Sequence, residues 1–318
     1  MTIPPYLKPG DLVGVTCPAS KMDREAALFA ASVLESWGYR VRVGRTAGSA
    51  FHNFSAPDAI RLEELQQMLD DDEVKAILFG RGGYGLVRIL DALDFTRFRA
   101  RPKWICGYSD ITALHLHIHA RFHIATLHSV MCSGITRETS SDPYVESLHR
   151  ALAGEGLDYR FASHPLNRPG TAEGELIGGN LSLLANISGT VSQPDTTGKI
   201  LFVEDVGEYR YAVDRMMLNL RRAGWLKGLA GLVVGSFTAE RETDTPFGQS
   251  DQELILDKVI EEDFPVAFGF PVGHSSRNYA LKEGCRYRLS VDEAPRLTEW
   301  SGTSASLYYS PDVDQPDS

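Results

Sequence analysis

The chain has 318 residues, of which 43% are hydrophobic and 23% are charged, values typical of a soluble globular protein with a sizeable core. At roughly 100–200 residues per domain, this length predicts two domains. The chain carries 32 Lys and Arg against 42 Asp and Glu, and the resulting net charge of −10 argues against nucleic acid or an anionic membrane as its main partner.

The start of the chain and its cysteines bear on its compartment. Residues 1–15 show no charged leader followed by a long apolar run, so no secretory signal is expected. No apolar stretch approaches the ~20 residues that a membrane span needs. The four cysteines, Cys17, Cys106, Cys132 and Cys285, are far apart and mostly lie in apolar runs. We therefore expect reduced core cysteines in a cytoplasmic protein.

The first half of the chain alternates strand and helix patterns. Strands are expected at residues 11–18, 39–43, 75–79, 104–106 and 124–127. Helices are expected at residues 24–37, 59–70, 86–93, 111–121 and 144–152. Strands that alternate with helices through short loops predict an α/β fold with a parallel sheet. Functional loops of such sheets gather at the carboxyl ends of the strands.

The second half has a different texture. Residues 153–170 are polar and rich in Gly and Pro, and we interpret them as a linker. Beyond the clustered glycines of residues 173–180, strands are expected at 199–203, 231–237, 265–270 and 286–291, with more β structure toward Tyr308. Helices are expected at 181–187, 211–223 and 252–261. The predicted division is a domain at 1–152, the linker, a domain at 171–308 and a frayed acidic tail at 309–318.

Residues 103–112 combine a strand, a turn and the start of a helix. The apolar run stops at Gly107, Ser109 and Asp110 follow, and a helical pattern opens at Ile111. A serine in such a turn lies at a helix N-terminus, where free backbone N–H groups gather. Ser109 could therefore be a nucleophile beside a site for an oxyanion. Either Ser109 or Asp110 could instead be an N-cap, and this stretch alone slightly favours the cap.

A serine nucleophile needs a base, and the base needs an orienting carboxylate. Glu204 closes an apolar strand, and His274 lies in a Gly-flanked loop, where catalytic residues are over-represented. Taken singly, Glu204 is more simply an N-cap or a surface ion pair, and His274 an ordinary loop histidine.

The glycine-rich turn at residues 80–85 directly follows a predicted strand. Glycine lets a backbone come close to a ligand. The turn lacks the Lys-Ser/Thr of a phosphate-binding loop and the spacing of a dinucleotide fingerprint. It is a weak nucleotide signal but a reasonable source of a second N–H donor for an oxyanion.

Four histidines fall on or next to one predicted helix: His115, His117, His119 and His123. Two pairs of them are four residues apart, a spacing that can bind zinc. No Glu stands beside them as in an H-E-x-x-H motif. We therefore expect helix surface and domain contact, with a metal site the less favoured outcome.

Several short motifs occur together in one order: Arg-Gly-Gly-Tyr-Gly at 81–85, Gly-Tyr-Ser-Asp-Ile-Thr at 107–112, Gly-Gly-Asn-Leu at 178–181, Val-Glu-Asp-Val-Gly-Glu at 203–208, Val-Asp-Arg-Met at 213–216 and Gly-His at 273–274. Jointly they resemble the LD-carboxypeptidase family (serine peptidase family S66), which includes murein tetrapeptide carboxypeptidases and microcin C immunity peptidases. The likeness covers roughly residues 7–291.

The resemblance implies a triad in which Ser109 is the nucleophile, His274 the general base and Glu204 the residue that orients His274. It implies a Rossmann-like amino-terminal domain and a smaller β-rich carboxyl-terminal domain, with the active site in the cleft between them. It also implies a homodimer that uses no metal and no cofactor.

The resemblance further implies an oxyanion hole made by the backbone N–H of Asp110 and that of a glycine, Gly83 in preference to Gly82. The implied reaction is hydrolysis of the amide between an L-centre (meso-diaminopimelate or L-lysine) and the terminal D-alanine of murein tetrapeptide. It would proceed through an acyl-enzyme, in the cytoplasm, during cell-wall recycling.

Other functions stay open at this stage. Residues 281–284 read Leu-Lys-Glu-Gly where family members often have a Leu-Pro-Leu-Gly type segment, a departure that bears on substrate preference. A peptidase that cleaves a peptidyl-nucleotide antibiotic would need an aromatic side chain near the site, for which Trp225 and Trp300 are candidates. A non-catalytic protein that binds a small ligand, and a zinc hydrolase that uses the histidine helix, are the alternatives from other classes.

Overall fold

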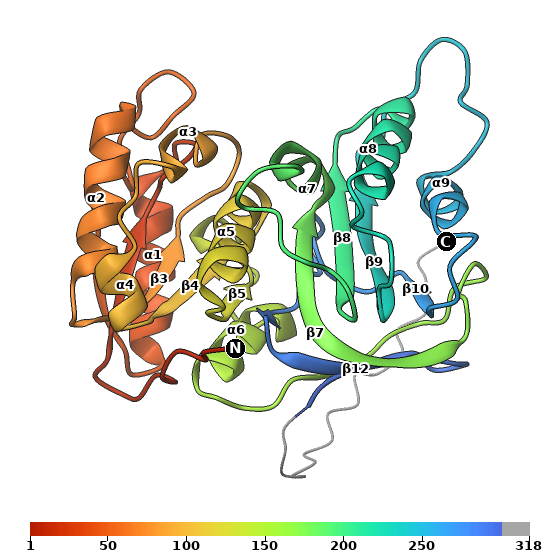
Figure 1. The fold of residues 1–318 in the computed structure, drawn as a ribbon. Coiled ribbons are helices and arrows are strands. Elements are labelled where there is room, and N and C mark those ends of the chain that lie inside the picture. The colour runs from red at the N-terminus through yellow and green to blue at the C-terminus, as the bar shows by residue number, and fades with distance from the viewer. Residues whose placement is uncertain (301–318) are drawn as a thin grey trace.

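The computed structural model describes residues 1–300, which form two β-sheets with helices packed around them (Figure 1). The predicted tail at 309–318 and the β structure expected toward Tyr308 lie outside the described residues. Within residues 1–300, no helix combines the length and the apolar character needed to cross a bilayer.

The first sheet has six strands in the order β11-β5-β4-β3-β1-β2. These strands are β1 (Leu12–Thr16), β2 (Arg40–Val43), β3 (Val74–Phe79), β4 (Trp104–Gly107), β5 (Thr126–His128) and β11 (Leu281–Glu283). All neighbours are parallel except β11, which runs antiparallel to β5. The carboxyl ends of β3 and β4 therefore meet at one edge, where functional loops gather.

Six helices accompany this sheet: α1 (Arg24–Ser36), α2 (Asp58–Asp70), α3 (Val87–Leu90), α4 (Thr96–Ala100), α5 (Thr112–Phe122) and α6 (Pro143–Leu152). Two short 3₁₀ turns, η1 (Ser109–Ile111) and η2 (Cys132–Gly134), lie between them. The helix expected at 86–93 is shorter than predicted. The chain leaves it after Leu90, and the unpredicted helix α4 begins at Thr96, whose N–H donates to Asp94 Oδ1 at 2.8 Å.

The second sheet has seven strands in the order β10-β9-β8-β7-β12-β13-β6. They are β6 (Asp158–Arg160), β7 (Gly170–Asn180), β8 (Ile200–Val206), β9 (Gly231–Thr238), β10 (Val266–Phe268), β12 (Arg286–Val291) and β13 (Arg296–Glu299). The accompanying helices are α7 (Leu181–Ile187), α8 (Arg210–Arg222) and α9 (Asp251–Lys258). Strands β7 to β10 pair in parallel and the others antiparallel. The predicted α/β class with a β-rich second half is confirmed.

Two strands of this sheet differ from the prediction. Strand β6 lies inside the expected linker and pairs with β13. Strand β7 covers the cluster of glycines, a residue that is depleted in strands. Gly178 explains the exception, because a Cβ at this position would collide with the backbone oxygen of Phe202 on the neighbouring strand β8. The glycine lets β7 pass close to β8.

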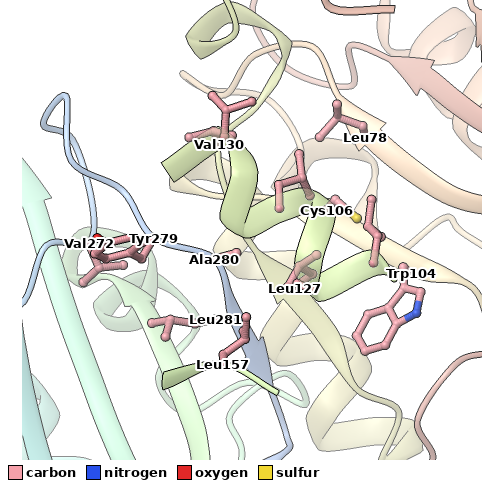
Figure 2. Packing of buried hydrophobic residues seen from close by; sticks show 14 of the residues in the cluster. Leu78, Trp104, Cys106, Leu127, Val130, Leu157, Val272, Tyr279, Ala280 and Leu281 are labelled. Atoms are coloured by element: carbon pink, nitrogen blue, oxygen red, sulfur yellow. The ribbon is translucent and has the colours of Figure 1, made fainter. Parts of the chain in front are cut away.

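The two sheets share buried apolar contacts. Strand β11 comes from the predicted second domain and yet completes the first sheet. In Figure 2, Leu127 of β5 faces Ala280 and Leu281, with Val272 and Tyr279 beyond them. Helix α5 lies between the sheets and packs against α7 and β7 (Figure 1). The relative placement of the two halves is therefore set by a continuous core.

The four cysteines are buried and free, as expected for reduced core residues. The predicted domain ranges stay a prediction, to which the structure adds the crossing of β11 into the first sheet.

Candidate active site

Three side chains from distant parts of the chain lie in one hydrogen-bonded line. Ser109 Oγ is 3.0 Å from His274 Nε2, although the two residues are 165 positions apart. Nδ1 of the same ring is 2.7 Å from Glu204 Oε2. This is the geometry in which an imidazole can take a proton from a hydroxyl while a carboxylate orients it.

Ser109 owes its position to a strained turn. Strand β4 ends at Gly107, and Ser109 has a φ of 64°, a left-handed conformation that costs a non-glycine residue about 1–3 kcal/mol. The N-cap of η1 is Tyr108 and that of α5 is Ile111, and neither makes a side-chain cap bond. The N-cap interpretation of Ser109 and Asp110 is therefore wrong. The Asp110 carboxylate instead accepts the N–H of Leu86 at 2.8 Å.

Glu204 is completely buried within strand β8, so neither the N-cap nor the surface ion pair describes it. Its Oε2 accepts two hydrogen bonds from His274, one from the ring at 2.7 Å and one from the backbone N–H at 3.2 Å. Burial by itself lowers the pKa of His274, but the bond to Glu204 and its charge outweigh burial, and the pKa is raised. Donation of Nδ1–H to Glu204 leaves Nε2 to accept the Ser109 proton.

Glycines make this close packing feasible. Gly273 has a φ of 111°, and a Cβ there would lie 2.5 Å from Glu204 Oε2. A Cβ at Gly235 on β9 would lie 3.2 Å from the Cβ of Glu204. The Glu204 side chain thus packs against backbone at two positions where a residue with a Cβ would crowd it.

Two residues that sequence reasoning missed hold the loop of His274. Asn278 Oδ1 accepts the N–H of Gly273 at 2.9 Å and lies 2.9 Å from His128 Nε2. His128 ends strand β5, at the same sheet edge as Ser109. The sequence signal that could have identified His128 is its place at the carboxyl end of a predicted parallel strand.

The structure places Gly82 and Gly83 of the glycine-rich turn differently. A Cβ at Gly82 would lie 3.0 Å from Ser109 Oγ and 3.4 Å from the backbone nitrogen of Asp110. A Cβ at Gly83 would instead collide with Ser20, whose N–H donates to the Gly82 carbonyl at 3.1 Å. Because the C=O and N–H of a trans peptide point in opposite directions, the Gly83 N–H points away from the Ser20 N–H.

A cavity of about 240 Å³ lies near the triad, although Ser109, Glu204 and His274 do not line it themselves. Tyr108 precedes Ser109 in the chain and Ser275 follows His274, and both line this cavity. The other lining residues are Val130, Ser133, Gly134, Thr136, Thr139, Asp142, Tyr144, Val145, Ser276 and Asn278. Among these described residues, hydroxyl groups predominate and Asp142 is the charged side chain. The cavity therefore offers hydrogen bonds and one negative charge.

The histidines of α5 are not on the surface of the protein. His115, His117 and His119 are buried, and burial lowers the pKa of each. The expected helix surface is wrong for these three because α5 is enclosed between the two sheets. The expected domain contact is confirmed, since His117 bonds Ser192 Oγ at 2.8 Å and His119 meets Glu175 at 3.4 Å. Within residues 1–300, no group of His, Cys, Asp or Glu is arranged to hold a metal ion.

The two tryptophans proposed for stacking lie elsewhere. Trp225 is completely buried, and its Nε1–H donates to Ser188 Oγ at 2.9 Å. Trp300 follows β13, and the guanidinium of Arg288 lies over its ring. Neither lines the cavity beside Ser109.

The chain is similar to known proteins over most of its length. Residues 13–129 match the LD-carboxypeptidase N-terminal domain, and residues 173–289 match the LD-carboxypeptidase C-terminal domain. A probable murein peptide carboxypeptidase of Bacillus subtilis is 36% identical over 307 residues, which cover 96% of each chain. A murein tetrapeptide carboxypeptidase of Pseudomonas aeruginosa is 29% identical, over 90% of this chain and 94% of the relative.

Solved structures show the same fold. The muramoyltetrapeptide carboxypeptidase from Oxalobacter formigenes superposes with a TM-score of 0.83 at 28% identity, covering 91% of this chain and 99% of the other. The microcin C7 self immunity protein MccF, in complex with aspartyl sulfamoyl adenosine, gives a TM-score of 0.82 at 20% identity, covering 96% of this chain and all of the other. At 20% identity, the likeness to MccF shows a shared fold and nothing more.

The Glu204→Gln variant should lower the pKa of His274. The amide removes the charge that holds the imidazolium form, so the desolvation caused by burial then dominates. We expect the wild-type ring to titrate above the ordinary value of about 6.5 and the variant ring below it. NMR titration of His274 measures both values, and an unchanged or higher pKa in the variant would contradict this assignment.

The Gly273→Ala variant should be destabilised by more than its backbone strain. The added Cβ would press on Glu204 Oε2, and overpacking typically costs about 1–3 kcal/mol. Gly269→Ala is the matched control, because Gly269 also has a positive φ of 78° but open space where a Cβ would stand. Chemical denaturation measures the free energy of unfolding of both variants. Equal losses would contradict the prediction that the contact with Glu204 destabilises Gly273→Ala.

Proposed function

The chain belongs to the LD-carboxypeptidase family of serine peptidases, and on that premise we propose that it removes the terminal D-alanine from murein tetrapeptide. The bond cleaved is the amide between D-alanine and the preceding L-centre, meso-diaminopimelate or L-lysine. The observation that carries the proposal is the line from Ser109 through His274 to Glu204. The names of the relatives from two bacteria support the substrate class. We further propose that the enzyme acts in cell-wall recycling, that it is located in the cytoplasm and that it forms a homodimer.

The three side chains divide the chemistry between them. His274 Nε2 takes the proton of Ser109 Oγ as the oxygen attacks the amide carbonyl carbon, and Glu204 stabilises the imidazolium that forms. His274 then gives this proton to the leaving nitrogen as the C–N bond breaks, which releases D-alanine and leaves an ester on Ser109. A water molecule, deprotonated by His274, hydrolyses the ester and restores the serine.

Two backbone N–H groups would hold the oxyanion. Asp110 lies in the first turn of η1, where N–H groups have no partner within the helix. The close approach of Gly82 to Ser109 supports the glycine-rich turn as the other wall, with the Gly83 N–H still the preferred donor. One such donor is typically worth about 10²–10³ in turnover.

The cavity beside the triad supports a choice of which substrate part enters it. Asp142 would repel the terminal carboxylate of D-alanine and attract an ammonium group. The side chain of L-lysine ends in an amino group, and that of meso-diaminopimelate ends in a carbon that bears both an amino group and a carboxylate, so both offer an ammonium group to Asp142. We therefore assign the cavity to the side chain of the L-centre, on the acyl side of the cleaved bond.

The alternative of a peptidyl-nucleotide substrate has less support. The likeness to MccF at 20% identity concerns the fold, and the name of that structure describes a ligand of that protein. Trp225 and Trp300 do not line the cavity, so neither of these two rings can stack on a base there, and the rings that do line it are those of Tyr108 and Tyr144. The hydrogen-bonded triad argues against a non-catalytic binding protein.

Release of D-alanine from murein tetrapeptide, followed by mass spectrometry, tests the serine mechanism. We expect release in the presence of EDTA, and about a 10⁶-fold loss of turnover in Ser109→Ala, because the attacking hydroxyl is gone. Loss of activity with EDTA would select a metal hydrolase. Unchanged activity of Ser109→Ala would contradict the nucleophile. No release from the wild type, with cleavage of a peptidyl-nucleotide, would select the alternative substrate.

The Asp142→Asn variant tests the assignment of the cavity. With tetrapeptides that contain L-lysine or Nε-acetyl-L-lysine, the wild type should prefer the free amine by roughly tenfold in kcat/KM, the worth of one charged hydrogen bond. The variant should lose this preference. Glu146→Gln on α6 makes the same change in charge outside the cavity and should keep it. A full preference retained by Asp142→Asn would overturn the assignment.

A further inference from the structure

The loop that carries His274 connects the two sheets. Residues 269–280 leave the second sheet after β10 and end at β11, which pairs antiparallel with β5 of the first sheet. In this pairing Leu281 stands opposite His128. Figure 2 shows Val272 and Tyr279 of this loop on one side and Leu127 of β5 on the other, with Ala280 and Leu281 between them. The proposed base therefore lies on a segment that is anchored at both ends.

The second sheet fixes the first part of this loop. The N–H of Ser236 donates to the Val272 carbonyl at 2.9 Å, and Thr238 Oγ1 donates to the His274 carbonyl at 2.9 Å. Both donors belong to β9. Together with Glu204, these two donors fix His274 within the second half of the protein. None of them fixes the position of His274 relative to Ser109 in the first half.

The first sheet reaches the same loop through His128 and Asn278. Asn278 is 2% exposed and His128 is fully buried, so their hydrogen bond is shielded from water. The N–H of Gly273 donates to Asn278 Oδ1, which fixes this atom as the acceptor. The ring must then donate from Nε2–H. Burial lowers the pKa of His128 to about 3, so the ring is a neutral donor at any working pH.

We propose that His128 and Asn278 are positioning residues for the base: this buried pair fixes Gly273 from the first sheet, and thereby sets the imidazole of His274 at bonding distance from Ser109. The inference rests on the proposed function of the triad. Gly273 directly precedes His274, so a shift of Gly273 displaces both bonds to Glu204 and the bond to Ser109. A misplacement of about 1 Å can cost 10²-fold in rate.

A purely structural role is the competing explanation, and His117 supplies the control for it. His117 is also a buried histidine of the first half, and its Nδ1 bonds Ser192 Oγ of the second half at 2.8 Å. Its hydrogen bond and ring contacts within residues 1–300 are with Ser192, Phe95 and Phe122, and none involves the loop at 269–280. His117→Leu therefore removes a comparable bond between the two halves without touching the base.

The experiment compares His128→Leu, Asn278→Ala, His128→Gln and His117→Leu with the wild type. The rate at which a fluorophosphonate labels Ser109 reports on the activated serine without any peptide. We expect His128→Leu and Asn278→Ala to lower both the labelling rate and kcat about 10²-fold, with KM within about twofold. His128→Gln can donate to the same acceptor and should recover most of the rate. His117→Leu should stay within about threefold of wild type at a similar loss of thermal stability.

The outcomes separate the two proposals. Labelling of folded His128→Leu at the rate of His117→Leu would overturn the positioning role, and so would a His128→Gln variant no better than His128→Leu. Should His128→Leu not fold, the labelling rate of Asn278→Ala decides by the same comparison with His117→Leu. A wild-type enzyme that the reagent does not label would instead contradict the triad itself.

Discussion

The hydrogen bond between Ser109 Oγ and His274 Nε2 joins the two halves of the protein, and the proposed chemistry depends on it. Neither half holds a complete set of reactive groups. Ser109 follows a strand of the first sheet, while Glu204 and His274 belong to the second half. A distance of 3.0 Å across such a junction requires that the halves be held rigidly. The shared core, the crossing of β11 into the first sheet and the His128–Asn278 pair all act in that direction.

A second buried contact ties the helix after Ser109 to the other half. The N–H of Asn180 donates to Thr112 Oγ1 at 3.1 Å, and the Asn180 side chain donates to Asp205 Oδ1 at 2.8 Å. Asp205 adjoins Glu204 on β8, and burial raises its pKa to about 7. Adjacent buried carboxylates are costly unless hydrogen bonds satisfy them. The two adjacent buried carboxylates lie beside the triad, where the two halves of the protein meet.

The sequence predicted the parallel sheet because strand and helix patterns alternate through short loops, and strands such as β1 and β3 are indeed buried almost throughout. It identified Ser109, Glu204 and His274 as candidates through their places at strand ends and in a loop, and through a family resemblance that the comparisons confirm. It could not separate a nucleophile from an N-cap at Ser109, because that depends on a φ of 64°. It missed β7 because glycines there serve the close approach to β8 rather than local propensity. The burial of His115 and the pairing of His128 with Asn278, 150 positions away, arise from packing between distant segments.

The most direct test of the central claim relates the covalent state of one residue to activity. The enzyme is treated with a fluorophosphonate for increasing times, the fraction labelled at Ser109 is measured by peptide mapping, and the release of D-alanine is measured on the same samples. The account predicts that activity falls in proportion to the fraction of Ser109 labelled. Full activity in a sample whose Ser109 is completely labelled, or loss of activity with the label on another residue, would contradict it.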